Sequence, residues 1–228
     1  MKTFREQVAQ AELVTFDAGN TLIVPHPSVG EIYAEVAAQH GLTLDPAETD
    51  VRFRTAFKEA THTPKDRQGV EDDKNLWRIV VRASLPANLP PDFPFEPFFD
   101  VLYRTFAAGQ RWRLLPGARA LPEAIAKTGR RVAVLSNADA RFRQVFADLG
   151  LGEIFAEMFI SGEIGVEKPD VRIFRAVEAA TGVSPERILH VGDSLIHDVE
   201  GAEAAGWRAA YVTRERHLPD LLAELEPA

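Results

Sequence analysis

The sequence contains no cysteine. A disulfide framework, a thiolate nucleophile and a zinc site built on thiolates are therefore excluded. Positive charge is also scarce, since 26 lysines and arginines stand against 34 aspartates and glutamates, for a formal net charge of −8. A protein that binds the phosphate backbone of a nucleic acid needs a basic stripe, so we expect no nucleic-acid partner.

Long apolar runs are missing as well. Residues 1–12 are mostly polar or charged, where a secretory signal would carry an apolar core. No apolar run approaches the roughly 18 residues of a membrane-spanning helix. We therefore expect a cytoplasmic protein with no membrane segment. A hydrophobic content of 46% over 228 residues is enough for one catalytic domain and a smaller inserted module.

Five short apolar runs have the composition of buried strands, and most of them end abruptly in polar or glycine residues. These runs are residues 13–16, 131–135, 158–160, 188–192 and 209–212. Amphipathic stretches that indicate helices alternate with them, at about 118–128, 139–149, 171–181 and 198–205. This alternation of strand and helix predicts an α/β fold with a doubly wound parallel sheet.

Residues 25–112 interrupt this alternation. Four stretches in this region have helical character, and no strand is convincing there. The stretches are 29–40, 46–60, 70–84 and 95–108. Their apolar residues recur at helical spacing, which indicates the core of a small bundle. We therefore expect a catalytic core of residues 1–24 and 113–228, with a helical module of residues 25–112 inserted after the first strand.

Polar side chains follow three of the expected strands directly. Asp17 follows the first, Ser136 and Asn137 follow the second, and Asp193 follows the fourth, with Asp198 five residues later. Ligands of doubly wound sheets bind beyond the carboxyl ends of the strands, so these side chains should converge. Two or three carboxylates in one crevice cannot all stay ionised without a cation. An oxygen-rich set of this kind suits Mg²⁺.

A lysine adds positive charge to this region. Lys168 lies in the turn before the helix expected at 171–181, and it is followed by Pro169 and Asp170. A lysine there supplies a point charge for a phosphate group. The combination of carboxylates, a hard cation and a lysine favours a site that handles a phosphate group.

Four short motifs, in this order along essentially the whole chain, resemble those of the haloacid dehalogenase-like (HAD) hydrolase superfamily. They are Asp17-Ala18-Gly19-Asn20-Thr21, Ser136-Asn137, Lys168-Pro169, and Gly192-Asp193 continuing to Asp198. Each motif is weak alone, but the ordered set at strand ends is specific. The resemblance implies a Rossmann-like core and a helical cap, inserted between the first two motifs, that closes over the site and selects the substrate.

The resemblance also implies a metal site. Asp17 would be both the nucleophile and a ligand of Mg²⁺, and the backbone carbonyl of Gly19 would be a second ligand. Asp193 would bind the same metal. Asp198 would support the metal or Lys168.

The remaining motif residues would handle the transferred group. Ser136 would hydrogen-bond to it, Asn137 next to Ser136 would help to bind the substrate, and Lys168 would neutralise its charge. Phosphoryl transfer requires mostly positioning and charge neutralisation, which such a set can provide.

One position departs from the family pattern. Family phosphatases carry a second aspartate two residues after the nucleophile, which protonates the leaving group and then activates water, but here that residue is Gly19. Loss of a general acid or base typically costs about 10²–10⁴-fold in rate. Simple alkyl phosphates should therefore be poor substrates. A Mg²⁺-dependent phosphatase of activated phosphates, such as acyl phosphates, accounts for the glycine most economically.

Three alternatives stay open. A 2-haloacid dehalogenase also lacks this aspartate, but it needs no metal, whereas this chain keeps Asp193, Asp198 and Lys168. A protein with little turnover that only binds a phosphorylated ligand is a second alternative. A phosphonoacetaldehyde hydrolase would need an amine in the cap, for which the candidates are Lys58, Lys65 and Lys74.

Two histidines lie near the acidic residues in the sequence. His190 belongs to an apolar strand, and His197 precedes Asp198. A metal-binding role is conceivable for either. We expect instead that His190 is a hydrogen-bonded core residue and that His197 lies at the rim of the site.

Overall fold

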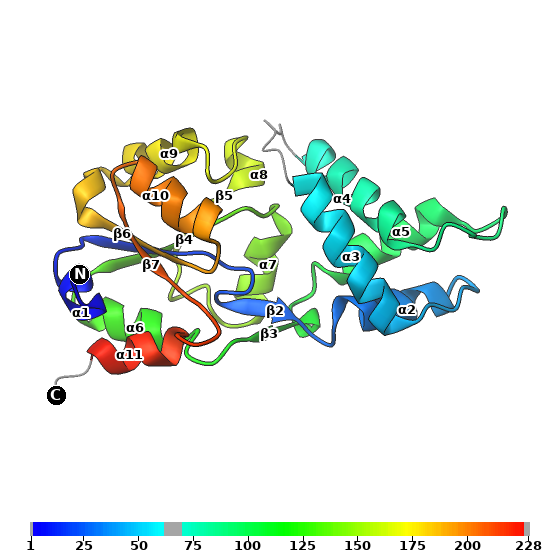
Figure 1. Ribbon diagram of the computed structural model, residues 1–228, viewed down its shortest axis with the longest axis horizontal. Helices are drawn as coiled ribbons and strands as arrows, with labels where there is room; N and C mark the ends of the chain where they lie inside the picture. The colour runs from blue at the N-terminus through cyan, green and yellow to red at the C-terminus, as the bar shows by residue number, and fades with distance from the viewer. Residues whose placement is uncertain (1, 62–69, 226–228) are drawn as a thin grey trace.

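A five-stranded parallel sheet forms the centre of the protein (Figure 1). The computed structural model describes residues 2–61 and 70–225. The sheet has the order β5-β4-β1-β6-β7, and every neighbouring pair is parallel. Its strands are β1 (Leu13–Phe16), β4 (Arg131–Ser136), β5 (Glu157–Ile160), β6 (Ile188–Gly192) and β7 (Arg208–Tyr211). All five predicted strands are confirmed, and the central strands β1 and β6 are buried along their whole length.

Helices cover both faces of the sheet. Successive residues of each strand point to opposite sides, so both faces carry apolar side chains that the helices bury. Val14 and Phe16 pack against one layer of helices, and Leu13 packs against the other. The first layer consists of α1 (Phe4–Ala9), α6 (Ala120–Lys127), α7 (Arg141–Asp148) and α11 (Leu218–Leu225). The second layer consists of α9 (Val171–Thr181) and α10 (Gly201–Ala204), which lie above the sheet in Figure 1. The structure is thus the doubly wound α/β fold that the sequence predicts.

A helical lobe lies beside the sheet (Figure 1). Its helices are α2 (Val29–Ala38), α3 (Pro46–Thr61), α4 (Val70–Ser84) and α5 (Phe95–Thr105). They form a hydrophobic core of their own, in which Tyr33, Val36, Phe98 and Leu102 are almost completely buried. The four predicted helical stretches of this region are therefore confirmed. None of the described helices is both long enough and apolar enough to cross a membrane.

Two short strands join the lobe to the core. β2 (Ile23–Pro25) and β3 (Trp112–Leu114) pair antiparallel, with Ile23 opposite Leu114 and Pro25 opposite Trp112. The expectation that residues 25–112 contain no strand is therefore wrong at both ends of that range. Strands of three residues are too short to show the alternation by which a strand is found in a sequence.

Some helix ends also differ from the prediction. The helix expected over 95–108 ends at Thr105, and Gly109–Arg111 form the separate 3-10 helix η1. The helix expected over 198–205 begins earlier, as the π-helix η3 (Leu195–Glu200) that leads into α10. Asp198 and Val199 both donate their backbone N–H to the carbonyl of Ser194, which widens this first turn. A short helix, α8 (Ser161–Ile164), and the 3-10 helix η2 (Pro185–Arg187) complete the fold.

Candidate active site

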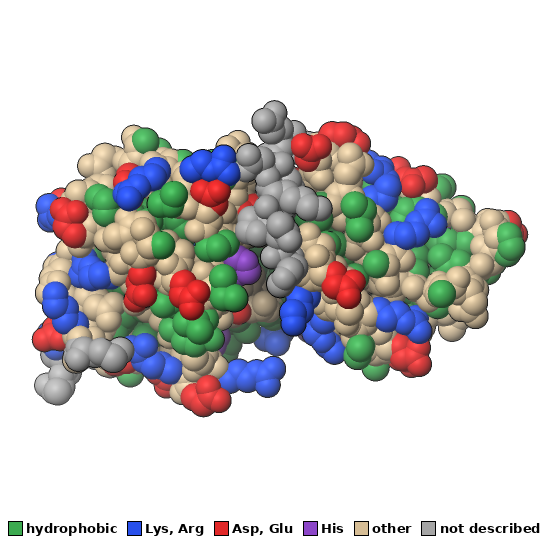
Figure 2. All heavy atoms as spheres, turned by 45° about the horizontal axis from the view of Figure 1, so that its top comes forward, with side chains coloured by type: hydrophobic (Ala, Val, Ile, Leu, Met, Phe, Trp, Pro, Cys, Tyr) green, Lys and Arg blue, Asp and Glu red, His purple; other side chains and the backbone are tan. Residues whose placement is uncertain are grey.

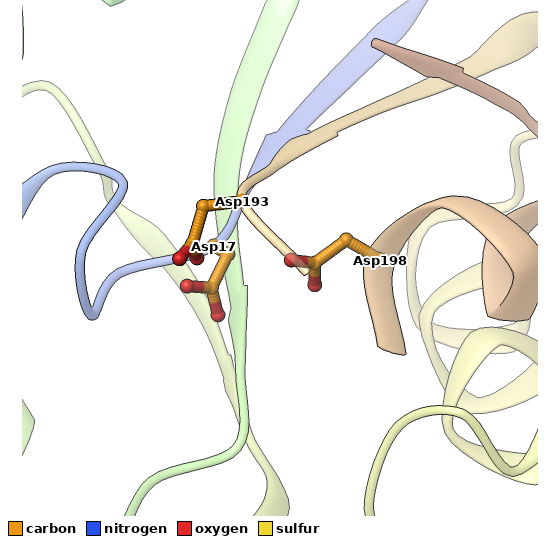
Figure 3. Close-up of side chains that lie close together, drawn as sticks. All are labelled: Asp17, Asp193 and Asp198. Atoms are coloured by element: carbon orange, nitrogen blue, oxygen red, sulfur yellow. The ribbon is translucent and has the colours of Figure 1, made fainter. Parts of the chain in front are cut away.

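Three carboxylates meet at the carboxyl end of the sheet, where the sequence predicts them. Asp17 follows β1 and Asp193 follows β6, its neighbour in the sheet, while Asp198 belongs to η3. Figure 3 shows the side chains of Asp17 and Asp193 next to each other, with Asp198 approaching from the helix. Each residue offers one oxygen, and these oxygens lie within 4.8 Å of one another.

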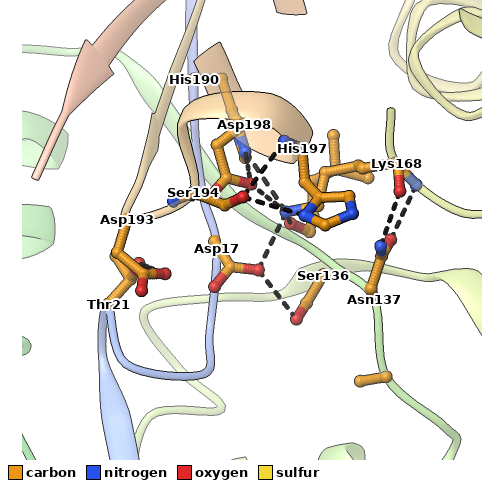
Figure 4. Close-up of polar contacts among 12 residues, drawn as sticks. Asp17, Thr21, Ser136, Asn137, Lys168, His190, Asp193, Ser194, His197 and Asp198 are labelled. Atoms are coloured by element: carbon orange, nitrogen blue, oxygen red, sulfur yellow. Dashed lines mark hydrogen bonds and ion pairs between the residues drawn. The ribbon is translucent and has the colours of Figure 1, made fainter. Parts of the chain in front are cut away.

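Lys168 is the cation at the centre of this group. Its side chain is 1% exposed, and its Nζ donates to Asp17 Oδ1 at 2.9 Å and to Asp198 Oδ1 at 2.6 Å (Figure 4). A third bond of 2.9 Å runs to the carbonyl of Leu135. A lysine is buried this deeply only when it is paired, so the ammonium and the two carboxylates stabilise one another.

Ser136 and Asn137 contact Asp17 and Lys168 differently. The Ser136 hydroxyl donates to Asp17 Oδ1 at 3.1 Å. The Asn137 amide bonds twice to the backbone of Lys168, since its Nδ2 donates to the carbonyl and its Oδ1 accepts from the N–H, both at 2.8 Å. Asn137 therefore fixes the turn that carries Lys168, whereas Ser136 contacts the Asp17 carboxylate itself.

Asp198 is held from several sides. Its Oδ1 accepts from Lys168 and lies 3.1 Å from His190 Nε2, and its Oδ2 accepts from the backbone N–H of Ser194 at 2.8 Å. His190 is fully buried and bonds through Nδ1 to the Thr15 hydroxyl at 2.8 Å, as expected for a core histidine. Because N–H donors occupy both oxygens of Asp198, the geometry favours it as a support for Lys168 over a role as metal ligand.

The proximity of these groups shifts their pKa values. Burial, together with the negative charges of Asp17 and Asp198, raises the pKa of Asp193 to about 7. Burial also raises the pKa of Asp17, although the Lys168 ammonium opposes this rise. Burial would raise the pKa of Asp198 as well, but the charge of Lys168 and the bond from His190 hold it well below its usual range. Two carboxylates that resist ionisation side by side are a ready site for a divalent cation.

Replacing Lys168 with methionine should lower the free energy of unfolding by about 3–5 kcal/mol near neutral pH, because Asp17 and Asp198 would lose their buried partner. Without the ammonium, we expect burial to raise the pKa of Asp198 above its value in the unfolded chain. The loss should therefore be largest at neutral pH and should shrink as the pH falls into the ordinary carboxyl range. Urea unfolding in EDTA at several pH values measures this. Lys127→Met, at an exposed lysine that ends α6, is the control and should change stability by no more than about 0.5 kcal/mol. A loss independent of pH would contradict this account.

The loop after Asp17 leaves open space where family phosphatases carry their second aspartate. A Cβ atom built on Gly19 would meet no heavy atom within 4 Å. Asn20 adopts a left-handed backbone with φ of 58°, a conformation that asparagine tolerates better than most residues. The Thr21 hydroxyl donates to Asp193 Oδ1 at 3.2 Å, which ties the loop to the second carboxylate.

A cavity of about 500 Å³ opens above these residues, between the sheet and the helical lobe. This volume is typical of sites for small molecules. Asp17, Ser136, Lys168 and Asp193 line one end, and His197 borders it, as expected for a rim residue. Figure 2 shows a hollow between the two lobes, with acidic and basic side chains interspersed over the visible face.

The helical lobe lines this cavity with a row of aromatic rings. Trp77 of α4 stacks on Phe57 of α3 with centroids 5.7 Å apart, and Phe57 stacks on Phe53 at 5.8 Å. Phe53 contacts the edge of Tyr33 at 6.0 Å, and Tyr33 contacts Phe106 at 6.2 Å. All five side chains line the cavity. Helical spacing predicts core positions for Phe53, Trp77 and Phe106, which do pack against the core of the lobe, but it does not reveal the cavity that they also border.

The row continues into the α/β core. Phe106 contacts Trp112 of β3 at 6.2 Å, and Trp112 contacts Phe142 of α7 at 5.1 Å. Both of these residues line the cavity too. The rings therefore form one continuous aromatic row, from Trp77 in the lobe to Phe142 beside the sheet.

A polar contact joins the lobe to the core at the Trp77 end of this row. The Trp77 indole N–H donates to Asp139 Oδ2 at 2.8 Å. Asp139 also pairs with Arg141 at 2.6 Å, and the Arg141 guanidinium lies 3.6 Å from the centre of the Tyr103 ring. Asp139 follows β4 by three residues, so the same strand end that carries Ser136 also contacts the lobe.

Residues 11–206 match the sequence profile of haloacid dehalogenase-like hydrolases. This chain belongs to that family. The chain is 31% identical over 222 residues to the haloacid dehalogenase-like hydrolase domain-containing protein 3 of Mus musculus. The match covers 96% of this chain and 88% of that protein. A phosphoserine phosphatase of Thermus thermophilus is 39% identical over 221 residues, with 89% of each chain covered. The resemblance that the four motifs indicate is thereby confirmed, as is the hydrolase class.

A solved structure shows the same fold. The HAD-hydrolase YfnB of Bacillus subtilis, which was solved bound to magnesium, superposes with a TM-score of 0.72 at 17% sequence identity. The match covers 94% of this chain and 98% of that one, so it includes both the sheet and the helical lobe.

Proposed function

We propose that this hydrolase is a Mg²⁺-dependent phosphatase of small phosphorylated molecules that works through an aspartyl phosphate on Asp17. The observation that carries the proposal is the position of the Asp17 carboxylate, at the floor of a cavity and within hydrogen-bond reach of both Lys168 and Ser136. We further propose that residues 1–24 and 113–228 act as the catalytic core and that residues 25–112 act as a cap that selects the substrate.

The donor set fits Mg²⁺. Mg²⁺ in proteins usually takes one or two carboxylates together with water and substrate phosphate. Asp17 and Asp193 supply adjacent carboxylates, with the Gly19 backbone at the same end of the cavity and Asp198 adding negative charge behind them. When bound there, the ion would hold the phosphate against Asp17 and offset its negative charge.

The side chains of this chain supply the nucleophile for the first chemical step and the charges that stabilise it. An oxygen of Asp17 attacks the phosphorus atom, the bond from phosphorus to the leaving oxygen breaks, and its electron pair goes to the leaving group. The Lys168 ammonium and the Ser136 hydroxyl stabilise the negative charge beside the reacting carboxylate. Water then attacks the phosphorus of the aspartyl phosphate and loses a proton to the solvent, and the bond from phosphorus to the Asp17 oxygen breaks, which releases inorganic phosphate and restores the Asp17 carboxylate.

The glycine at position 19 determines which leaving groups suit this site. No carboxyl group stands two residues after Asp17 to protonate a leaving oxygen. An acyl phosphate or another activated phosphate needs no such proton, since its leaving group is already a weak base. We therefore place activated phosphates ahead of simple alkyl phosphates as substrates.

Phosphate release from acetyl phosphate and p-nitrophenyl phosphate, with Mg²⁺ and with EDTA, tests the proposal. We expect turnover that EDTA abolishes and added Mg²⁺ restores, with acetyl phosphate preferred. Chloride release from 2-chloropropionate that persists in EDTA, without phosphatase activity, would instead establish a dehalogenase. Binding of phosphate without any turnover would establish a ligand-binding protein.

A phosphonoacetaldehyde hydrolase would need a lysine of the lobe at the cavity, and neither candidate lysine among the described residues lies there. Lys74 pairs with Asp100 at 2.8 Å, and neither Lys74 nor Lys58 lines the cavity. Lys65 lies outside the described residues. Borohydride inactivation that depends on phosphonoacetaldehyde would reveal a Schiff base and would replace the phosphatase proposal.

A further inference from the structure

Three polar side chains of the cavity wall away from Asp17, those of Trp77, Trp112 and Arg141, are engaged within the protein. The indole N–H of Trp77 donates to Asp139, and that of Trp112 donates to the carbonyl of Phe106 at 3.0 Å. The guanidinium of Arg141 is paired with Asp139 and also donates to the carbonyl of Tyr103 at 2.7 Å. Trp77 and Trp112 therefore offer mainly ring surface to a ligand.

The aromatic row is accessible from the cavity. Phe57 is 37% exposed, and Phe53, Trp77, Phe106 and Phe142 are all partly exposed while lining the cavity. Partly exposed rings along a cavity wall favour a flat apolar ligand, since aromatic rings in contact stabilise one another beyond the area that they bury. The end that holds Asp17, Ser136 and Lys168 is in contrast strongly polar. A ligand that fits has a phosphate at one end and an aromatic body at the other.

The missing acid at position 19 indicates the same class of molecule independently. A phenol has a pKa of about 10, as in tyrosine, so a phenolate leaves far more readily than an alkoxide. An aryl phosphate thus meets two conditions that the structure sets separately: its ring matches the aromatic row, and its leaving group needs no proton from residue 19.

We propose that the substrates of this site are aryl phosphate monoesters with a ring body larger than one benzene ring. This inference rests on the proposed phosphatase function and narrows it. In the reaction, Asp17 attacks phosphorus, the bond from phosphorus to the aryl oxygen breaks, and the phenolate leaves with the electron pair and takes its proton from water. Water hydrolyses the aspartyl phosphate to inorganic phosphate. No oxidant or further reactant is required.

Four phosphates separate the aromatic body from the leaving group. 2-Naphthyl phosphate and phenyl phosphate have similar phenolate leaving groups but rings of different size. Benzyl phosphate carries a ring on an alkoxide, and acetyl phosphate has a good leaving group without a ring. We expect kcat/KM for 2-naphthyl phosphate to exceed that for phenyl phosphate about tenfold, the scale of one added ring contact. Benzyl phosphate should inhibit competitively and turn over slowly.

Variants at Phe57, next to the Trp77 end of the row, and at Phe142, its other end, test the contact directly. Phe57→Leu and Phe142→Leu should each lower the preference for 2-naphthyl over acetyl phosphate about tenfold. The control is Phe95→Leu, because Phe95 stacks on Phe99 in the lobe and does not line the cavity. This control should leave the preference unchanged. The measured quantity is the ratio of kcat/KM for the two substrates in the same variant. A lower concentration of folded protein affects both values equally and cancels in this ratio.

The outcomes distinguish this inference from the proposed function. Hydrolysis of acetyl phosphate with no preference for 2-naphthyl over phenyl phosphate would overturn the inference and leave the phosphatase standing. A higher kcat/KM for phosphoserine, the substrate named for the Thermus relative, would overturn it in the same way. Failure to hydrolyse any of these phosphate compounds in the presence of Mg²⁺ would refute the proposed phosphatase function itself.

Discussion

Replacing Asp17 with asparagine should reduce Mg²⁺-dependent phosphate release by about 10⁴–10⁶-fold, the scale on which enzymes lose activity with their nucleophile. Asparagine keeps the shape of the side chain and can still accept the bonds from Lys168 and Ser136. It lacks the negative charge and the nucleophilic oxygen that attack on phosphorus requires. Initial rates with acetyl phosphate at saturating Mg²⁺ measure the effect.

The matched control for this prediction is Asp92→Asn. Asp92 is exposed between α4 and α5 and does not line the cavity. The same chemical change there should leave the rate unaltered. Since Asp17 also belongs to the carboxylate group, Mg²⁺ binding by the variant should be measured by calorimetry. Residual turnover above one tenth of the wild-type rate at saturating Mg²⁺ would show that another group attacks the substrate.

Replacing Gly19 with aspartate should raise kcat/KM for an alkyl phosphate, such as propyl phosphate, by about 10²-fold, the lower end of what a positioned general acid contributes. The site has room for the change, because a Cβ on Gly19 meets no atom within 4 Å. The new carboxyl group would lie two residues after the nucleophile and could protonate the leaving alkoxide. Acetyl phosphate, whose leaving group needs no proton, should gain much less.

Gly19→Asn separates proton transfer from the other effects of a larger side chain. Asparagine has nearly the same size as aspartate but carries no titratable proton. It should give no gain with propyl phosphate, and the activity gained by Gly19→Asp should depend on pH through the new carboxyl group. Equal rates for the two variants would mean that residue 19 does not limit the reaction through a missing acid.

The convergence of Asp17 and Asp193 could be predicted because parallel sheets have a simple signature. Strands buried on both faces read as unbroken apolar runs, and their carboxyl ends share one edge of the sheet. Asp17 and Asp193 follow such runs, so their convergence could be derived without coordinates. The short strands β2 and β3 lack the length for any such signal. Helix α1 does carry a signal in the sequence, because Thr3 and Glu6 have the spacing of a capping box, and the structure shows that they form one.

The contacts within the site could not be derived in the same way. The ion pair between Asp198 and Lys168 joins residues 30 positions apart in the sequence. His190, which also contacts Asp198, lies inside a strand. Helical spacing identified the apolar face of each lobe helix, but it cannot tell whether that face meets another helix or borders a hollow. The role of Phe57 and Phe53 as cavity wall therefore emerged only from the packing of α3 against its neighbours.

The most direct test of the account is chemical trapping of the intermediate on Asp17. The carboxylate missing at position 19 would also have activated water for the second step, so the aspartyl phosphate should accumulate during turnover. The enzyme is quenched during hydrolysis of acetyl phosphate with Mg²⁺, reduced with borohydride, digested and analysed by mass spectrometry. The account predicts that Asp17 is converted to homoserine, in amounts that fall when Mg²⁺ is withheld. Phosphate release with an unmodified Asp17, or with the modification on another residue, would contradict it.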